Sequence, residues 1–230
     1  IGKAQEVEQN NYLCTKCLVE ACSATKTKLV TISSTSVYGT QSNIVDEECL
    51  ASDLKPQSPY AETKLREEIL VRKWVEEKGL KAITLRFGTI FGTSQGMRFH
   101  TAVNKFCWQA SLGLPITVWK TALNQKRPYL DLIDATSSIV HVIERDIFDG
   151  GIYNVLTMNA TVKDIIEEIS LVHSNINIEF VENAIMNQLS YEVSNEKFTK
   201  TGFTAKGSLR RGIRETLNIL SQSNSMRILK

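Results

Sequence analysis

A tyrosine stands four residues before a lysine in the segment SPYAETK, residues 58–64. If the segment is helical, four residues turn the chain by about 400°, so the side chains of Tyr60 and Lys64 point within about 40° of each other. A positive charge beside a phenol favours the phenolate, whereas a free tyrosine has a pKa of about 10. The spacing therefore predicts a general acid/base.

The same spacing occurs at Tyr12 and Lys16, and the sequence context separates the two pairs. The β-branched run KLVTIS, residues 28–33, predicts a buried strand, and the hydroxyl-rich segment SSTSVYG, residues 33–39, follows from its end. Open parallel α/β sheets bind their ligands at the carboxyl ends of strands. Because no such strand end precedes Tyr12, we interpret the earlier pair as accidental and assign the chemistry to the later one.

Helical and strand-like segments alternate along the chain. Ser58 caps a predicted helix that has Pro59 at its first position and ends at Gly79. Other helices are predicted at residues 11–24, 102–111, 134–145, after Thr161 and at 208–220, a polar loop at 34–55, and strands at 28–33, 80–87, 116–119, 129–132, 151–156 and 177–181. The alternation predicts an α/β fold with a parallel sheet.

Composition limits the possible partners. The 230 residues suit one domain, or one domain with a small lobe, and the net charge of +2 gives no argument for nucleic acid. No apolar run approaches the ~18 residues that span a bilayer, and no signal-peptide pattern is present, so we expect a cytoplasmic protein without a membrane partner. The five cysteines include Cys14-x-x-Cys17, but no second pair or histidine lies nearby, so we expect reduced thiols and no metal.

The motifs resemble a known family. TISSTSVYG, residues 31–39, followed by YAETK at 60–64, is similar to the extended short-chain dehydrogenase/reductases, in the nucleotide-sugar epimerase/dehydratase branch. The agreement continues, in order, through NNYLCTKCLVEAC (10–22), LRFGTIFG (85–92), RPYLDLIDA (127–135), GGIYNV (150–155) and TGFTAKGSLRRGIRETL (201–217). The resemblance thus covers nearly the whole chain.

This resemblance implies a Rossmann-like doubly wound parallel sheet with a smaller C-terminal substrate lobe. On its pattern, residues 1–95 and 121–160 belong to the NAD(P)-binding domain, and residues 96–120 and 161–230 to the substrate lobe. The family begins with a strand and a glycine-rich turn whose amides meet the cofactor pyrophosphate. Nothing in this sequence matches that turn, so we expect the N-terminal strands to be missing from this chain and its own affinity for NAD to be low.

The family also implies roles for individual residues. Ser34 would hydrogen-bond the reacting sugar oxygen, Tyr60 would be the acid/base, and Lys64 would lower the pKa of Tyr60 while holding the nicotinamide ribose. Ser33 and Phe87 complete the expected cofactor-binding set. The expected cofactor is NAD, and NADP stays open because the acidic residue that decides between them is not found in this sequence.

Further positions correspond to substrate-binding residues of the family. Arg127 would grip a substrate diphosphate, and Thr89 stands where the family usually has an asparagine. The segment MRFHTAVN offers Arg98, His100 and Asn104 in place of the family's substrate asparagine. We expect all five to bind the substrate together with the catalytic serine, although a structural role, such as a core contact or an ion pair, stays open for each.

The combined pattern favours an NAD(P)-dependent epimerase of a nucleotide-activated sugar. The family's 4,6-dehydratases carry Asp-Glu after the catalytic hydroxyl, where this chain has Thr35-Ser36, so dehydration would lack its second acid and base. Two alternatives remain. One is a reductase or decarboxylase on the same scaffold, and the other is a nucleotide-binding protein of this fold without turnover.

Assembly is expected to involve two helices. The predicted helix at 59–78 carries Leu65 and Ile69 about 100–140° around from Lys64, which is more apolar surface than one sheet contact requires. The family resemblance implies that this helix and the one at 11–24 meet their symmetry mates in a homodimer, the commonest assembly of soluble proteins. The alternative is that another part of the same chain covers the second stripe.

Overall fold

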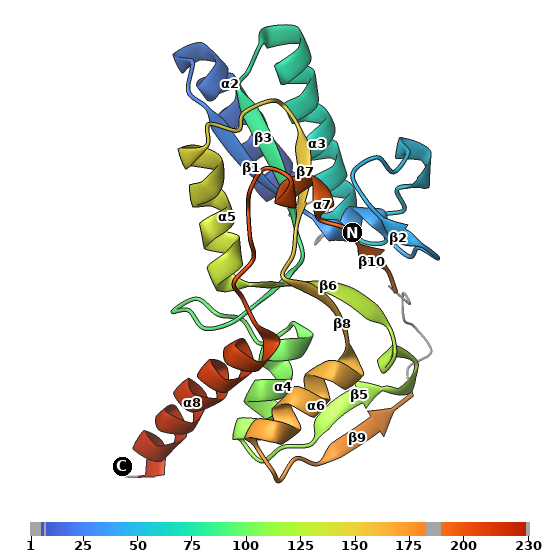
Figure 1. Ribbon diagram of the computed structural model, residues 1–230, viewed down its shortest axis with the longest axis vertical. Coiled ribbons are helices and arrows are strands. Elements are labelled where there is room, and N and C mark those ends of the chain that lie inside the picture. Colours follow the sequence, from blue (N-terminus) through green and yellow to red (C-terminus); the bar gives the residue numbers. More distant parts are fainter. Residues whose placement is uncertain (1–5, 7, 183–189, 229–230) are drawn as a thin grey trace. The chain divides into compact units, whose positions relative to one another are not determined.

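The computed structural model describes residues 6, 8–182 and 190–228, and the chain divides into two compact units (Figure 1). Unit 1 comprises residues 1–88, 137–155 and 191–204, and unit 2 comprises residues 89–136, 156–190 and 205–230. The bounds of these units differ from those of the predicted lobes, because 89–95, 121–136 and 156–160 fall in unit 2 and 191–204 falls in unit 1. The division into a cofactor domain and a substrate lobe stays a prediction.

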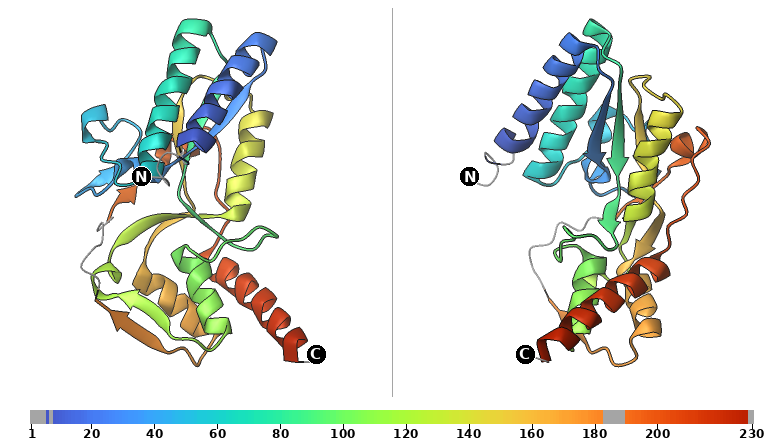
Figure 2. Two further views of the ribbon diagram at one scale, coloured as in Figure 1. Left: turned by 180° about the vertical axis from the view of Figure 1, so that it is seen from behind. Right: turned by 90° about the vertical axis from the view of Figure 1, so that its left-hand side faces the viewer.

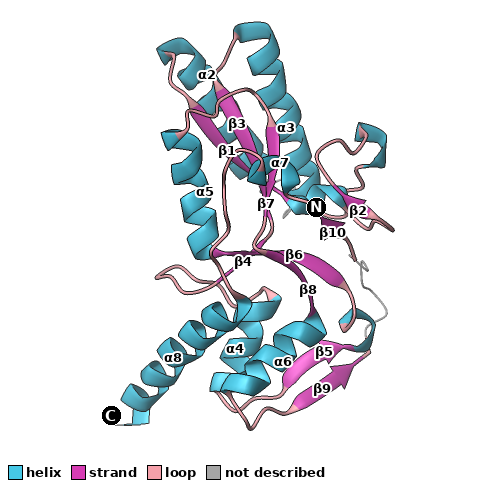
Figure 3. Cartoon of the chain, viewed as in Figure 1, coloured by secondary structure: helices cyan, strands magenta, loops and turns pink. Residues whose placement is uncertain are grey.

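A parallel sheet forms the centre of unit 1, in the order β1–β3–β7 (Figure 3). Its strands are β1 (Leu29–Ser34), β3 (Ala82–Phe87) and β7 (Ile152–Val155). Helices α2 (Cys14–Thr25) and α3 (Pro59–Lys78) lie side by side on one face, and the unit 1 part of α5 (Leu132–Glu144) lies on the other (Figure 2). The predicted α/β fold with a parallel sheet is confirmed.

Local signals explain where α3 begins and ends. Ser58 Oγ accepts a hydrogen bond from the Ala61 amide (3.1 Å), and Pro59 occupies the first helical position. Gly79 ends the helix at φ 66°, a left-handed conformation that glycine adopts without steric cost, and its amide donates to the Val75 carbonyl (3.1 Å). The predicted helix is therefore confirmed at both ends.

Apolar side chains hold α2 and α3 to the sheet. Val19, Leu29, Val71, Leu80 and Ala82 form one buried cluster. Burying a Val or Leu side chain contributes about 1.5–3 kcal/mol, so the cluster is a substantial part of the energy that fixes α3 in place. The same helix carries Tyr60 and Lys64.

The predicted polar loop at 34–55 is partly structured. It contains short helical turns and one strand, and a distant segment supplies the partner of that strand. The elements of the loop are η2 (Thr35–Tyr38), β2 (Ile44–Val45) and η3 (Ala51–Asp53), and β2 pairs in parallel with β10 (Glu192–Val193). Unit 1 also contains η1 (Glu8–Leu13) and α7 (Glu196–Thr199).

The described residues of unit 2 form two small sheets and three helices of their own. One sheet has the order β4–β6–β8, formed by β4 (Thr89–Phe91), β6 (Lys126–Asp131) and β8 (Met158–Thr161); the other pairs β5 (Ile116–Trp119) with β9 (Ile178–Val181). The helices are α4 (Ala102–Ser111), α6 (Val162–Val172) and α8 (Leu209–Ile228), and η4 (Lys120–Ala122) is a short turn. The sequence did not predict β4, which has only three residues, or β8, whose sequence MNAT has a single β-branched residue.

No helix in the described part of the chain is long and apolar enough to cross a membrane. Cys14 and Cys17 are exposed on α2, and Cys107 is buried. Within residues 6, 8–182 and 190–228, no three His, Cys, Asp or Glu side chains are grouped so as to hold a metal ion.

Candidate active site

Tyr60 and Lys64 lie together beside the end of β1. Lys64 Nζ donates to the Ile32 carbonyl (3.0 Å) and lies 5.9 Å from the centroid of the Tyr60 ring. The Lys64 side chain is 15% exposed, and Tyr60 is 43% exposed. The helical spacing thus brings a phenol and an ammonium group to one place on unit 1, where part of the tyrosine residue is open to solvent.

Ser34 is the last residue of β1 and the N-cap of η2. Its Oγ accepts hydrogen bonds from the amide of Ser36 (3.2 Å) and from its hydroxyl (2.9 Å). Since both contacts use Ser34 as the acceptor, its own O–H remains able to donate to a ligand. A hydroxyl that donates to a carbonyl or hydroxyl oxygen is what the predicted role requires.

Phe87 ends the neighbouring strand, β3, and pairs in register with Ser34. Phe87 is 6% exposed, and its carbonyl accepts a hydrogen bond from Thr35 Oγ1 (3.3 Å). Ser34 and Phe87 therefore lie at the same edge of the sheet, the edge to which Lys64 also reaches. The contact of Phe87 with a cofactor stays a prediction.

The acidity of Tyr60 differs from the sequence-based expectation. Burial raises the pKa of Tyr60 above its ordinary value, the charge of Lys64 lowers it, and the charge of Glu67 raises it. The lowering by Lys64 is present, as expected, but the loss of hydration around the phenol outweighs it in this structure. The phenol is therefore protonated at neutral pH when no ligand is bound.

Ser33 is directed into the core. It is 4% exposed, and its Oγ donates to Glu68 Oε1 (2.5 Å). The donor that a cofactor contact would use is thus engaged with a carboxylate inside unit 1. A cofactor contact by Ser33 remains a prediction that this arrangement does not favour.

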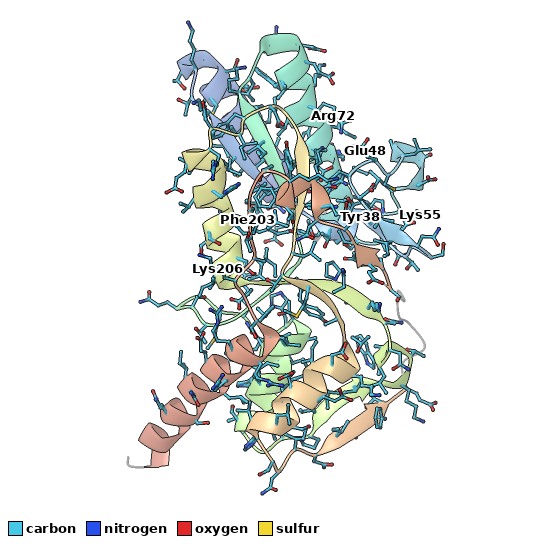
Figure 4. All side chains as sticks on the ribbon, viewed as in Figure 1. Tyr38, Glu48, Lys55, Arg72, Phe203 and Lys206 are labelled. Atoms are coloured by element: carbon cyan, nitrogen blue, oxygen red, sulfur yellow. The ribbon has the colours of Figure 1, made fainter. Side chains whose placement is uncertain are left out.

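A buried ion pair fastens α3 to β3. Arg86 donates to Glu68 through Nε (2.9 Å) and Nη2 (2.7 Å), and the two side chains are 4% and 3% exposed. The guanidinium also lies 4.8 Å from the centroid of the Tyr38 ring, labelled in Figure 4. Burial raises the pKa of Tyr38 to about 12, and its hydroxyl donates to Asn154 (3.0 Å).

Sequence reasoning did not find this network. Its one signal is Arg86, a charged residue inside AITLRF, a strand that is otherwise free of charge and buried along its whole length. A buried arginine needs a partner, but the sequence alone does not say which acid on which helix provides it.

In unit 2, three of the predicted substrate residues share a cavity of about 250 Å³. Thr89, His100 and Arg127 line it, together with residues that include Trp119 and Gln125. A cavity lined by a guanidinium, an aromatic ring and polar side chains is chemically suited to an anionic nucleotide.

The other two predicted substrate residues lie elsewhere in unit 2. Asn104 is buried; its Oδ1 accepts from the Gly92 amide (3.3 Å), and its Nδ2 donates to the Arg98 carbonyl (3.2 Å). Neither Arg98 nor Asn104 is among the described residues that line the cavity. Asn104 thus holds the backbone between residues 92 and 98, and substrate contacts by these two residues stay predictions.

Comparisons with known proteins identify the family of this chain. The model of the NAD dependent epimerase/dehydratase family matches residues 1–155. The chain belongs to the NAD-dependent epimerase/dehydratase family. The resemblance drawn from the sequence is therefore confirmed, and the matched region contains the Ser34, Tyr60 and Lys64 motifs.

Relatives of this family member include a plant enzyme. A trifunctional UDP-glucose 4,6-dehydratase/UDP-4-keto-6-deoxy-D-glucose 3,5-epimerase/UDP-4-keto-L-rhamnose-reductase of Arabidopsis thaliana is 29% identical over 237 residues, which cover 96% of this chain and 34% of the plant protein. The chain spans about a third of the length of the first curated relatives it matches.

Solved structures support the fold assignment. The UDP-glucuronic acid 4-epimerase from Bacillus cereus, in complex with UDP-glucuronic acid and NAD, superposes with a TM-score of 0.82 at 25% identity, covering 94% of this chain and 68% of that one. RMD from Pseudomonas aeruginosa, complexed with NADPH, gives 0.80 at 22% identity, over 94% of this chain and 74% of that one, and so bears on the fold alone. The Rossmann-type fold is confirmed.

Proposed function

We propose that this chain forms the catalytic part of an NAD(P)-dependent epimerase that acts on a nucleotide-activated sugar. The observation that carries the proposal is the set of Ser34, Tyr60 and Lys64 at the carboxyl end of β1. Family membership supports it, as does the similarity to an epimerase crystallised with a UDP-sugar and NAD. NAD is the proposed cofactor, with NADP as the alternative.

The residues around Lys64 fit the nicotinamide ribose of such a cofactor. Lys64 Nζ donates to two acceptors of the protein, Ile32 and Glu67, so one of its three N–H groups remains for a ribose hydroxyl. Tyr60 and Phe87 would border the same place. A nicotinamide cofactor held by these residues would supply a reversible hydride acceptor for the sugar.

Proton transfer falls to the chain's own side chains. Tyr60, as the phenolate, would take the proton of the sugar hydroxyl whose carbon is oxidised, and the charge of Lys64 would stabilise that phenolate. Ser34 would donate a hydrogen bond to the same sugar oxygen as it becomes a ketone. After the keto sugar has reoriented in the site, Tyr60 would return the proton. The product would then carry the opposite configuration at that carbon.

Recognition of the nucleotide is assigned to unit 2. We place the substrate diphosphate at Arg127, because a guanidinium binds phosphate oxygens in a bidentate manner. Thr89 and His100 line the same cavity and would contact the sugar or the phosphates. Arg98 and Asn104 would act through the loop backbone that Asn104 holds.

The function is tested by product analysis. The protein is incubated with a panel of UDP-sugars and with either NAD or NADPH, and the sugars are identified by NMR. Epimer formation with no net change in NADH is expected. Net consumption of NADPH would establish a reductase, release of carbon dioxide a decarboxylase, and binding without turnover a non-catalytic protein; each of these outcomes contradicts the proposal.

We also propose a homodimer through α2 and α3. Ile69 on α3 is 61% exposed and Leu18 on α2 is 50% exposed, whereas Leu65 is half-buried. Because α2 and α3 are neighbours, we place these side chains on one helical surface of unit 1 as part of the proposal. Apolar side chains on adjacent helices are the surface that a two-fold partner covers.

Charges on this surface should produce monomers. Replacing Leu18 and Ile69 with Glu is expected to lower the molar mass in solution from dimer to monomer, with an unchanged circular dichroism spectrum, as measured by sedimentation equilibrium. Leu50→Glu is the matched control, because Leu50 is 68% exposed in unit 1 but lies outside α2 and α3. A wild-type protein that is monomeric at tens of micromolar would contradict the dimer.

A further inference from the structure

Glu67 is a buried acid that the proposed chemistry does not use. It lies one turn after Lys64 on α3, its side chain is 8% exposed, and its Oε2 is 2.9 Å from Lys64 Nζ. Its other oxygen, Oε1, is buried and has no hydrogen-bond partner among the described residues. Leaving a buried carboxylate oxygen unpaired costs free energy, so this contact is a poor choice for stability alone.

The next residue shows what a stabilising pair looks like in the same helix. Both oxygens of Glu68 accept hydrogen bonds from Arg86, and Ser33 adds a third. The Lys64–Glu67 contact has one hydrogen bond, and its ammonium is the group placed beside the Tyr60 ring. The comparison points to an electrostatic role for Glu67 toward the candidate acid/base.

We propose that Glu67 is a positioning residue that acts through Lys64 and sets how readily the Tyr60 hydroxyl gives up its proton. The inference rests on the proposed function in treating Tyr60 as the acid/base. A carboxylate at 2.9 Å offsets the ammonium charge that would otherwise stabilise the phenolate. Glu67 thereby adds to the effect of burial and raises the pKa of Tyr60, against the lowering by Lys64.

The remaining charges near α3 are few. The elements packed against α3 are η1, α2, β1, η2 and β3. In sequence, β1 (LVTISS) and η2 (TSVY) carry no charged residue, and Arg86 of β3 is held by Glu68. The other titratable or charged groups described on these elements are Tyr12, Cys14, Lys16, Cys17, Glu20, Cys22 and the buried Tyr38. Burial has the largest effect on the pKa of Tyr60. The charged groups that act on it are Lys64, which lowers the pKa, and Glu67, which raises it.

Titration of Tyr60 in the ligand-free protein tests the inference. The phenol carbon of ¹³C-labelled tyrosine is followed by NMR against pH, and Tyr60→Phe identifies the signal. Glu67→Gln removes the carboxylate charge, so the Tyr60 midpoint should move to lower pH by roughly half to one unit. Glu62→Gln is the matched control, because Glu62 is an exposed acid two residues from Tyr60 on the same helix, and it should leave the midpoint unchanged.

An unchanged midpoint in a folded Glu67→Gln protein, or an equal shift in Glu62→Gln, would overturn the inference. If Glu67→Gln does not fold, Glu67→Asp replaces it; withdrawing the carboxylate by one methylene should give a smaller shift in the same direction, and no shift would again overturn the inference. The titration needs neither cofactor nor sugar, so its outcome is separate from a failure of the proposed function. In the active enzyme, the limb of the kcat profile that reports Tyr60 should move with the midpoint, while KM for the sugar stays the same.

Discussion

Replacing Tyr60 with Phe is expected to lower kcat by about 10²- to 10⁴-fold, the usual contribution of a general acid or base, while KM for the nucleotide sugar changes little. The variant loses only the phenol oxygen, and the ring can keep its place one turn before Lys64. A loss in kcat with a nearly constant KM identifies a group that acts in the transition state. Steady-state rates of sugar conversion, at saturating cofactor, provide the measurement.

Tyr12 is the matched control for this substitution. It stands at the same spacing from a lysine, but its ring lies 4.6 Å from the Arg66 guanidinium carbon, and no hydroxyl-rich strand end precedes it. Tyr12→Phe should therefore leave kcat close to the wild-type value. Near-normal turnover in Tyr60→Phe, or an equal loss in both variants, would show that the acid/base assignment is wrong.

The pH dependence of the same reaction follows from the state of Tyr60. Because burial raises its pKa, against the lowering by Lys64, the phenolate is scarce at neutral pH in the ligand-free protein. An oxidation step that needs the phenolate should speed up as pH rises toward that pKa. A kcat/KM profile reports this limb, and Tyr60→Phe should abolish it together with most of the rate.

Signals carried by neighbouring residues in the chain explain the successful predictions. Ser58, Pro59 and Gly79 each act within one helical turn, so the ends of α3 could be predicted from the sequence. The pairing of Tyr60 with Lys64 needs only helical geometry, and the contact of Lys64 with the Ile32 carbonyl near the end of β1 needs only a parallel strand beside the helix.

Contacts between distant segments explain most of what was missed. The Ser33 hydroxyl turns toward Glu68 because Arg86, on another strand, holds the carboxylate there. The sequence shows glutamates at both 67 and 68. It does not show that both oxygens of Glu68 accept hydrogen bonds whereas Glu67 Oε1 has no partner among the described residues. Short strands such as β4 form because they pair with strands far along the chain. A segment of three residues is too short to show the alternation that predicts a strand.

A large loss of stability is expected when Arg86 is replaced. Arg86→Met leaves the Glu68 carboxylate buried without its counter-ion, and breaking such a pair typically costs about 3–5 kcal/mol. Although burial alone would lower it, hydrogen bonding to Glu68 holds the pKa of Arg86 above its ordinary value, so the guanidinium is charged at neutral pH. Since the pair joins α3 to β3, the loss should fall on unit 1 and displace Tyr60 and Lys64 from the end of β1.

Hydrogen exchange, read by mass spectrometry, measures this loss within unit 1. Amides of α3 should exchange much faster in Arg86→Met than in the wild-type protein, because their protection reports the free energy of opening. Exchange is preferable to a single melting temperature, since a chain with two compact units need not unfold in one step. A double variant, Arg86→Met with Glu68→Leu, should recover part of the protection, because it no longer buries an unpaired charge.

Arg210 provides the matched control, because it distinguishes the effect of losing a buried ion pair from the effect of losing any ion pair. It donates to Glu168 through Nε (2.8 Å) and Nη2 (3.1 Å), the same two-bond geometry as Arg86 with Glu68, but its side chain is 59% exposed and lies in unit 2. Glu168 is 24% exposed, against 3% for Glu68, so water can replace its lost partner and Arg210→Met should leave exchange in α6 and α8 nearly unchanged. Equal losses of protection in the two variants would mean that the burial of Glu68 is not what makes Arg86 necessary. If Arg86→Met keeps full protection of α3, the buried pair does not hold the catalytic helix, and the apolar cluster around Val71 must do so alone.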